Sequence, residues 1–466
     1  MRAAKAIAVL ALFAVTLTGC VSIGASRTSA DRAGAMDGVW RSEGYGWIFE
    51  VRDGQAQKYD VTAISCLPTK TLTQLGPADA DGTVRFAGKS GTVSTTLRGL
   101  GGGRAVARLT GTVADIDLVA LPALPDACTR KTPTDPLTTF DVFWTTFSEN
   151  YNSLVRKHVD WPAVRAHYRP LVDTTSRDQL YQILVDMVAP LGDAHVCIEG
   201  PRHKSFCGKR PGTRDDTDLS RRAAAKSVDA HLRDDLAVAT IETFANDKIA
   251  YADLPGGYGY LRISSFQGYG GGDDSRDNPY PNAAALSQAL DAVFTPARVA
   301  AWHGLIIDVR WNDGGDDALG LQIAGRLTNA AYPAYTKQAR IDPSDPTRYG
   351  PPHPVTVTPA NEPRYTGPVR LLTSDLTVSA GETFTEALMG RTPAPSRIGT
   401  TTQGVFADDM DRALPNGWSF TLGNEDYITS DGHNYEGTGI PPTREVPVFT
   451  PDQLAQHIDP ALDALW

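Results

Sequence analysis

Three short apolar runs constrain the fold of this chain more than any other feature of its sequence. The runs are "GYGYLRISSF", "GLIIDVR" and "PVRLLTS", and each contains a segment with the length of a strand buried in a sheet. The segment "NAAALSQALDAVF" has the periodicity of a helix and lies between the first two, and another helix is expected to begin near Ser379. This alternation predicts an α/β core over residues 246–466, with at least some parallel strand pairing.

Residues 37–130 have a different pattern, in which short alternating segments are separated by Asp-Gly and glycine turns. Examples are "GWIFEVRDGQAQKYDVTAI" and "DGTVRFAG". Asp-Gly between alternating runs is a strong hairpin signal. The pattern predicts a small antiparallel β domain that has no evident chemistry of its own and would serve for binding or as a spacer.

Residues 131–200 are expected to form a helical subdomain. Five aromatic side chains fall on one face of its first helix: Phe140, Phe143, Trp144, Phe147 and Tyr151. Such a stripe is more typical of a core than of a ligand site. Ser176 is a candidate cap for a second helix, which Pro190 would end. The polar residues 201–245 are expected to form an insertion or a lid.

The N-terminal sequence "MRAAKAIAVLALFAVTLTGC" predicts export. Its apolar run follows a basic start and is too short to span a bilayer comfortably. The last four residues resemble the lipobox of bacterial lipoproteins, which predicts a signal peptide at 1–19, a lipid on Cys20 and a flexible tether at 20–36. The protein would then be anchored to a membrane of the cell envelope. The alternative is an ordinary secretory signal in which Cys20 has no such role.

The other cysteines predict disulfides rather than a metal site. An even number of cysteines in an exported chain is typical of disulfide bonding, and here four remain: Cys66, Cys128, Cys197 and Cys207. Four cysteines allow three pairings, of which sequence order favours Cys66–Cys128 and Cys197–Cys207. No CxxC or HExxH spacing occurs, so we expect neither a metal nor another cofactor.

The charge balance argues against nucleic acid as a partner. The net charge of the 466-residue chain is −10, and no basic stretch is concentrated enough to neutralise phosphates. Neither a Walker loop nor a Rossmann fingerprint is present in the sequence, which removes two common classes of nucleotide site.

The segment "TSDLTVSAGETF" offers two interpretations of Ser379. Ser379 and Glu382 have the spacing of a capping box, and on the local sequence alone a helix cap is the simpler interpretation. The same place suits a nucleophile, because the free N–H of Ala380 at the helix start could stabilise an oxyanion. The Gly-x-Ser-x-Gly pattern of an α/β-hydrolase is not met, since Thr377 occupies the first glycine position.

A nucleophilic serine needs a base and an acid, because its hydroxyl is protonated at neutral pH. His195 in "LGDAH" is the candidate base, since it lies in a turn just after a helix with a buried face. Glu436 in "NYEGTGIPP" is the candidate acid. A lone histidine in a loop is more often solvated than catalytic, and the same holds for a lone glutamate, so neither residue identifies a site by itself.

Taken together, six motifs in a fixed order resemble the C-terminal processing, or tail-specific, serine peptidases. They are "LGDAH", "GYGYLRISSF", "GLIIDVRWNDGG", "LLTSDLTVSAGETFTEAL", "RIGTTTQG" and "EGTGIPP". The first of them is similar to the histidine motif of the branch that resembles the tricorn protease core. The resemblance implies that Ser379 is the nucleophile, that His195 is the general base and that Glu436 is the acid supporting the base.

The resemblance also implies a fold and an oxyanion hole. The core would be of the crotonase-like or ClpP-like kind. The N–H of Ala380 would hold the oxyanion together with that of Gly314 or Gly315, and a missing donor in such a pair typically lowers turnover about a hundred- to a thousandfold. Residues 201–245 are too few for the PDZ domain of tail-reading members, so tail specificity does not follow from the resemblance.

Three positions depart from the family's pattern. Val405 stands where the lysine-dependent branch carries its base, and an apolar side chain cannot take a proton, so the base must be His195. Gly381 replaces the second serine of the "Ser-Ala-Ser-Glu" pattern, which should not affect the chemistry. Ala194 replaces a polar neighbour of the histidine in tricorn, which removes one possible supporting hydrogen bond.

These observations predict a lipid-anchored serine endopeptidase of the bacterial cell envelope that acts on peptides or proteins. Two alternatives remain. The superfamily includes retinoid-binding modules that resemble this core, so the chain could be a non-catalytic binding protein for a hydrophobic ligand or a protein. The β domain at 37–130 could instead be the functional part, docking envelope partners with the core as its scaffold.

Overall fold

The structure is a computed structural model that describes residues 36–464 apart from 90, 92, 173–175, 271–278 and 362. The predicted signal peptide, Cys20 and nearly all of the predicted tether lie outside the described residues. Among the residues that are described, none of the helices combines the length and the apolar character needed to cross a membrane.

The N-terminal part is a closed antiparallel β-barrel in which each strand pairs with the next and β1 pairs with β8. Its strands are β1 (Gly38–Ser42), β2 (Trp47–Arg52), β3 (Gln55–Thr62), β4 (Ser65–Gln74), β5 (Val84–Ala87), β6 (Val93–Gly101), β7 (Arg104–Leu109) and β8 (Ile116–Leu121). Fully buried side chains such as Phe49, Phe86 and Leu97 fill the interior. The antiparallel prediction is confirmed, and closure leaves no free strand edge.

Three α-helices follow the barrel, and the apolar periodicity predicts the first and the third of them. They are α1 (Pro136–Asn150), α2 (Trp161–Tyr168) and α3 (Arg177–Val188). The aromatic stripe of α1 is in the core: Phe140, Phe143 and Phe147 are completely buried. Ser176 caps α3 through a capping box with Gln179.

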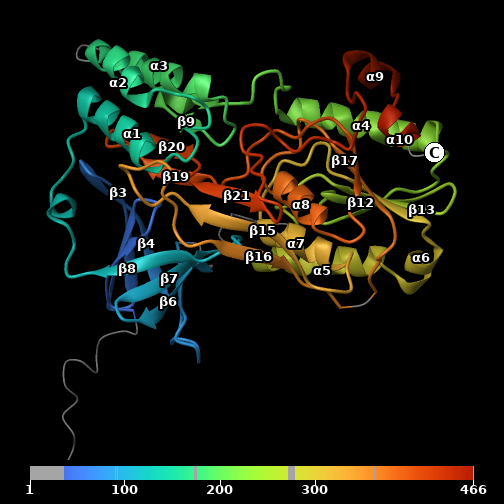
Figure 1. Ribbon diagram of the computed structural model, residues 1–466, viewed down its shortest axis with the longest axis horizontal. Helices are drawn as coiled ribbons and strands as arrows, with labels where there is room; N and C mark the ends of the chain where they lie inside the picture. The colour runs from blue at the N-terminus through green and yellow to red at the C-terminus, as the bar shows by residue number, and fades with distance from the viewer. Residues whose placement is uncertain are drawn as a thin grey trace, which may run out of the picture.

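The central sheet has the order β11-β12-β13-β14-β17-β18-β22 (Figure 1). Its strands are β11 (Glu242–Phe244), β12 (Ile249–Leu254), β13 (Tyr258–Ile263), β14 (Gly304–Asp308), β17 (Val369–Thr373), β18 (Ser396–Gly399) and β22 (Arg444–Glu445). From β13 to β22 the neighbours are parallel, whereas β11, β12 and β13 pair antiparallel. The predicted α/β core with parallel pairing is therefore confirmed.

Helices cover both faces of this sheet (Figure 1). One face packs against α5 (Pro279–Val293), α7 (Asp317–Gly325) and α8 (Ala380–Met389), and the other against α4 (Asp218–Asp234) and α10 (Pro460–Asp463). Successive strand residues point to opposite faces, so in β14 Leu305 and Ile307 enter the first core and Ile306 enters the second. The short helices α6 (Pro296–Ala301) and α9 (Pro451–Gln456) complete the α-helices among the described residues.

Residues 201–245 contribute to these layers. They include β10 (Ser205–Cys207), the long helix α4 and the edge strand β11. Val228 and Leu232 of α4 are buried against the sheet. The segment was expected to be an insertion or a lid because of its polar composition, which reflects the exposed face of α4.

Two smaller sheets join the core to the barrel. One has the order β10-β9-β20-β19, with β9 (Cys197–Glu199), β20 (Ser419–Leu422) and β19 (Met410–Ala413). The other has the order β16-β15-β21, with β16 (His353–Val357), β15 (Tyr332–Ala339) and β21 (Glu425–Thr429). Arg412 of β19 donates to the carbonyls of Tyr45 and Gly46, and Ala413 N donates to Asp60 of the barrel. These bonds fix the barrel against the core.

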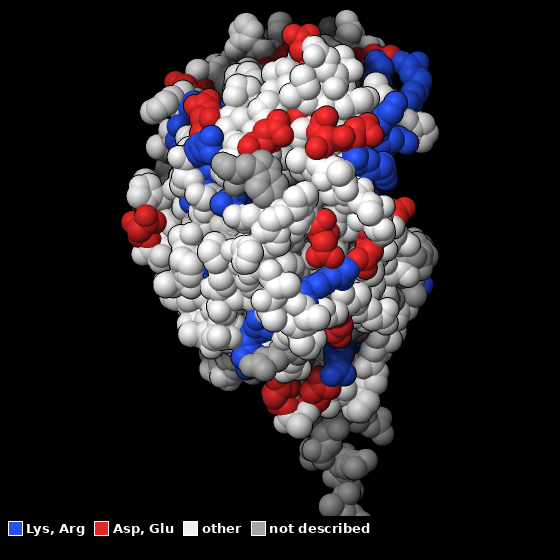
Figure 2. Space-filling model, turned by 90° about the vertical axis from the view of Figure 1, so that its right-hand side faces the viewer, with Lys and Arg blue, Asp and Glu red and all other residues white. Residues whose placement is uncertain are grey.

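Both predicted disulfides are present. Cys66–Cys128 ties strand β4 to the segment after the barrel, and Cys197–Cys207 joins β9 to β10. On the face of the molecule shown in Figure 2, acidic and basic side chains are mixed across a mostly uncharged surface.

Candidate active site

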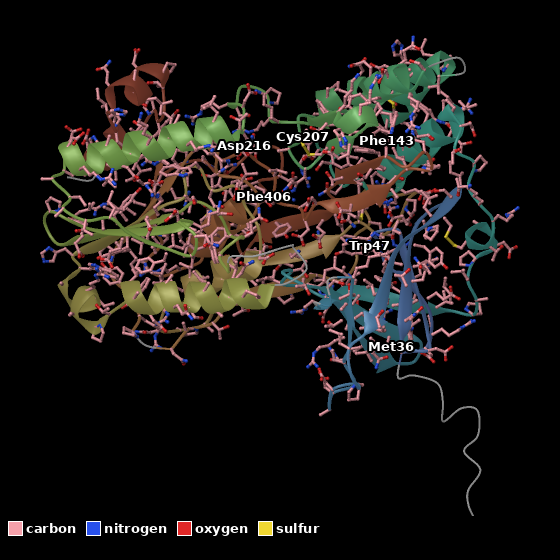
Figure 3. All side chains as sticks on the ribbon, turned by 180° about the vertical axis from the view of Figure 1, so that it is seen from behind. Met36, Trp47, Phe143, Cys207, Asp216 and Phe406 are labelled. Atoms are coloured by element: carbon pink, nitrogen blue, oxygen red, sulfur yellow. A yellow bond between two sulfur atoms is a disulfide. The ribbon has the colours of Figure 1, made fainter. Side chains whose placement is uncertain are left out.

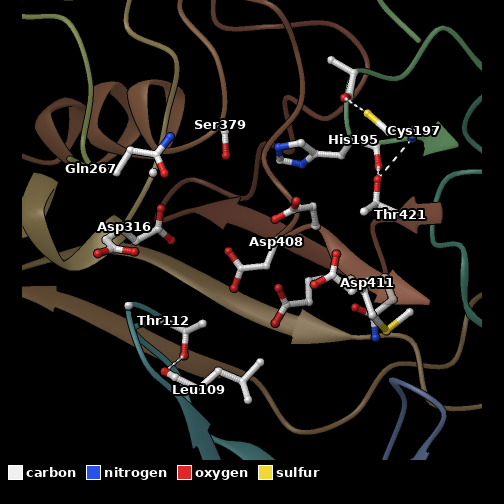
Figure 4. Close-up of a pocket in the computed structure, with 18 of the residues that line it drawn as sticks. Leu109, Thr112, His195, Cys197, Gln267, Asp316, Ser379, Asp408, Asp411 and Thr421 are labelled. Carbon is white, nitrogen blue, oxygen red and sulfur yellow. Dashed lines mark hydrogen bonds between the residues drawn. The ribbon is translucent and has the colours of Figure 1, made fainter. Parts of the chain in front are cut away.

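A cavity of about 650 Å³ lies between the barrel and the core, and Ser379 and His195 both line it. Figure 4 shows the imidazole ring of His195 directed toward the side chain of Ser379. The structure therefore brings the predicted nucleophile and base to one site, although they are 184 residues apart in sequence (379 − 195). No hydrogen bond joins these two described side chains, and such bonds often tighten only when substrate is present.

Ser379 stands at the first turn of α8, yet its hydroxyl makes no capping hydrogen bond. Its backbone has φ 53° and ψ −120°, a conformation that suits glycine and costs a serine roughly 1–3 kcal/mol. The preceding loop is held to the end of β14, because Val378 N donates to Asn312 O and Thr377 Oγ1 donates to Val309 O. The helix-cap interpretation of the hydroxyl is thus wrong, and the strained turn presents the side chain to the cavity.

Three hydrogen-bonding contacts hold His195 in position. Its backbone N–H donates to Asp193 Oδ1 at 2.9 Å, and its carbonyl accepts from Thr421 Oγ1 at 2.6 Å. The ring Nδ1 lies 2.5 Å from Ala407 O. A carbonyl can only accept, so Nδ1 carries the proton, and the neutral ring keeps Nε2 free to accept one.

Glu436 does not contact His195 directly in this structure. Its Oε2 accepts from Phe406 N at 2.9 Å and from Ala407 N at 3.1 Å. The carbonyl of Ala407 is the group that meets the His195 ring. The predicted acid therefore reaches the predicted base through the backbone of one residue, Ala407.

A second buried carboxylate holds the preceding part of the same loop. Glu382 on α8 accepts from Gly404 N at 2.6 Å and from Val405 N at 2.8 Å. Residues 404–407 are thus held by two glutamates, one for each pair of backbone N–H groups. We call this four-residue segment the clamped loop. Its position fixes the carbonyl that orients the His195 ring.

Both of these carboxyl groups titrate far from their ordinary range. Burial raises the pKa of Glu382 to about 7, and hydrogen bonds from Thr402 and from the backbone of Val405, Gly404 and Ser379 only partly oppose it. Burial, followed by the charge of Asp193, raises the pKa of Glu436 to about 7. Each group is therefore a mixture of acid and carboxylate near neutral pH.

We expect the stability of the core to fall as the pH rises from about 4.5 to about 7. In that window the unfolded chain has already released the protons of Glu382 and Glu436, whereas the folded protein still holds them. The expected slope is about 1 kcal/mol per pH unit for each group. Thermal unfolding of the wild type and of Glu382→Gln across this window measures it, and the variant should show the flatter dependence. Parallel curves for the two proteins would contradict the assignment.

Two backbone N–H groups near Ser379 are available to an oxyanion. Within the described residues, neither the N–H of Ala380 nor that of Gly315 has a hydrogen-bond partner. The N–H of Gly314 donates to Asn312 Oδ1 at 2.9 Å, which leaves Gly315 as the better candidate of the two predicted glycines.

Gly314 has a separate, steric role. Its φ is +86°, and a β-carbon placed on it would lie 2.7 Å from the Ser379 β-carbon. No other amino acid fits this close approach to Ser379. A β-carbon on Gly381 would similarly lie 2.9 Å from Asn312 Oδ1, so Asn312 explains why glycine stands in place of the family's second serine.

A buried charge network lies in the wall of the same cavity. Lys337 pairs with Asp408 at 2.7 Å and with Glu425 at 3.3 Å. Burial raises the pKa of Asp408, but the charge and hydrogen bond of Lys337, the hydrogen bond of Tyr427 and the charge of His195 together lower it below its ordinary value. Burial, then the charge of Asp408, raises the pKa of Asp317 to about 6. The carboxylate of Asp408 would stabilise an imidazolium on His195.

Several residues of this site were not predicted from the sequence. Asp193 and Asn312 lie inside the quoted motifs "LGDAH" and "GLIIDVRWNDGG", so their motifs were the available signal. Lys337 and Asp408 lie in none of the six motifs, and only the fold brings them to the cavity.

Comparisons with known proteins agree with this architecture. Residues 257–446 match peptidase family S41, and residues 133–189 match the tricorn protease C1 domain. No curated protein is similar enough to count as a match.

Two crystal structures share the fold. One is a candidate peptidase from Parabacteroides merdae, with 23% identity over 72% of this chain and 96% of that one and a TM-score of 0.58. The other is mature CPAF, with 12% identity over 69% of this chain and 94% of that one and a TM-score of 0.50. The two structures agree with the sequence matches in fold, and residues 257–446 carry a domain of peptidase family S41, a family of serine peptidases, behind a tricorn C1 domain at residues 133–189.

Proposed function

We propose that the protein is a serine endopeptidase in which Ser379 is the nucleophile and His195 the general base. The observation that supports this most directly is the position of Ser379. Its hydroxyl caps no helix, its backbone is held in a strained turn, and its side chain faces the His195 ring in a cavity. Strained residues of this kind cluster at active sites.

In the proposed reaction, Nε2 of His195 takes the proton of Ser379 Oγ as that oxygen attacks the scissile carbonyl carbon. The N–H groups of Ala380 and Gly315 hold the resulting oxyanion. The imidazolium then gives its proton to the leaving amine, and a water activated by His195 releases the acyl group from Ser379. The Ala407 carbonyl, positioned by Glu436, keeps the ring oriented throughout.

We further propose that the protein works outside the cytoplasm, attached to a membrane of the cell envelope through a lipid on Cys20. The two disulfides support the first part, because structural disulfides are typical of oxidising compartments. The lipobox-like sequence ahead of Cys20 supports the second part. The substrate would be a peptide or protein of that compartment.

Labelling with a fluorophosphonate tests the proposal, because such probes react with activated serines. We expect the wild type to be labelled on Ser379 and His195→Ala to be labelled at least a hundredfold more slowly, since the serine then lacks its base. Mass spectrometry of the labelled peptide identifies the site. An unlabelled wild-type protein that retains its fold would favour a non-catalytic binding module on the same core.

A further inference from the structure

The barrel forms one end of the cavity that contains Ser379. Side chains from several of its strands line that end: Trp47, Lys58, Leu72, Thr95 and Ile116. Figure 3 labels Trp47 at the place where the barrel meets the core. A substrate that fills the cavity would therefore touch the barrel as well as the catalytic residues.

Lys58 on strand β3 is an unusual side chain for such a place. It is only 9% exposed, and its Nζ lies 3.7 Å from the centre of the Trp47 ring. Its nearest carboxylate oxygen is Asp60 Oδ1 at 3.9 Å, beyond hydrogen-bond distance. Asp60 Oδ1 lies at a similar distance, 3.8 Å, from Arg412. Among the described residues, no acceptor is hydrogen-bonded to the Lys58 ammonium.

Two other lysines that line the cavity have carboxylate partners. Lys337 pairs with two carboxylates, and Lys209 pairs with Asp215. Lys70 also lines the cavity and is exposed at its rim. Lys58 thus stands out as a buried ammonium with unused donors facing the cavity.

The surroundings of Lys58 would favour an additional negative charge. Its pKa is lowered to about 8, chiefly by burial and also by the charges of Arg412 and Lys70, which together outweigh the opposing charges of Asp60 and Asp411. A buried ammonium without a hydrogen-bonded partner is unfavourable, and a carboxylate supplies both the acceptor and the charge.

We propose that Lys58 forms a subsite for a carboxylate of the substrate, either the C-terminal group of a peptide or the side chain of an Asp or Glu residue. The inference rests on the proposed function only in taking a peptide as the ligand. The substrate would run from Ser379 toward the barrel in extended form, with its carboxylate at the Trp47–Lys58 pair. The barrel would then select substrates rather than serve as a spacer.

The test uses the exported chain carrying Ser379→Ala, so that peptides bind without being cleaved. Two matched pairs of acetylated octapeptides are compared by calorimetry: a free C-terminus against an amide, and an internal Glu against Gln. We expect the carboxylate member of one pair to bind about tenfold more tightly, and that pair identifies the source of the carboxylate. Adding Lys58→Met, which keeps the aliphatic stem over Trp47, should remove the difference. Adding Lys131→Met, a change at an exposed lysine outside the cavity, should preserve it.

A second measurement needs no variant at Lys58. The protein carrying Ser379→Ala, which cannot cleave the peptide, is acetylated with a neutral amine-reactive reagent, and the modification at Lys58, Lys70 and Lys131 is followed by mass spectrometry. The preferred carboxylate peptide should slow modification at Lys58 at least fivefold and leave Lys131 unchanged.

The outcomes separate this inference from the proposed function. Equal binding within both peptide pairs, or a preference that survives Lys58→Met, would overturn the carboxylate subsite even if the wild type hydrolyses peptides. A preference that depends on Lys58 in a protein whose Ser379 does not react with fluorophosphonate would support the subsite and contradict the peptidase.

Discussion

Replacing Ser379 with alanine is expected to lower the turnover of a peptide substrate by about six orders of magnitude, if serine and histidine act as one unit. The alanine removes the attacking oxygen and nothing else in the site. The hydroxyl makes no capping bond, so the helix should lose little stability. Turnover is measured at saturating peptide, and the thermal unfolding midpoint is measured alongside.

The matched control is Ser396→Ala. Ser396 is exposed on strand β18 and does not line the cavity. It should leave both turnover and the unfolding midpoint unchanged. If Ser379→Ala keeps most of the activity of the wild type while Ser396→Ala behaves as expected, Ser379 is not the nucleophile.

The parts of the fold that the sequence predicts well are those whose signal is local. The strands around Ile306 and Leu371 are short apolar runs because both of their faces are covered, and such runs are visible in the sequence. Asp-Gly pairs mark the connections β2–β3 and β4–β5 of the barrel, and the aromatic stripe of α1 repeats with the helical period. The disulfide pairing followed from the order of the cysteines, because each pair lies within one structural unit.

Other features depend on contacts between distant residues and left no local signal. Barrel closure requires β1 to pair with β8, which joins residues such as Val39 and Leu121. The capping-box spacing of Ser379 and Glu382 suggested a helix cap, yet the turn has positive φ, the Ser379 hydroxyl makes no capping bond, and Glu382 also binds the clamped loop. A local sequence pattern does not show whether one of its residues makes contacts with distant parts of the chain.

The contacts of Glu436 differ from those expected of an acid that binds the catalytic histidine directly. The sequence resemblance implies an acid that supports His195, and in the structure Glu436 binds the N–H of Ala407, whose carbonyl meets the His195 ring. The two arrangements differ in what they need from the side chain. A direct partner of the imidazolium needs a negative charge, whereas a partner of backbone N–H groups needs only an oxygen that accepts.

Glu436→Gln and Glu436→Ala therefore have different expected effects. The amide oxygen of glutamine can still accept from Phe406 N and Ala407 N, so we expect kcat of Glu436→Gln to stay within about tenfold of the wild type. Alanine leaves two buried N–H groups without an acceptor and releases the loop, and a displacement of about 1 Å at the base costs about a hundredfold in rate. Steady-state kinetics on one peptide, with thermal unfolding as the check on folding, measures both variants.

Comparing Glu436→Gln with Glu436→Ala distinguishes an acid that contacts His195 directly from one that acts through the backbone of Ala407. In a triad with a direct acid, replacing the carboxylate by its amide costs about ten-thousandfold in turnover, because the histidine then adopts the wrong tautomer. Such a loss in a folded Glu436→Gln protein would show that Glu436 moves onto His195 when substrate binds. Retention of activity by the glutamine variant and its loss by the alanine variant would instead establish the backbone of Ala407 as the link between acid and base.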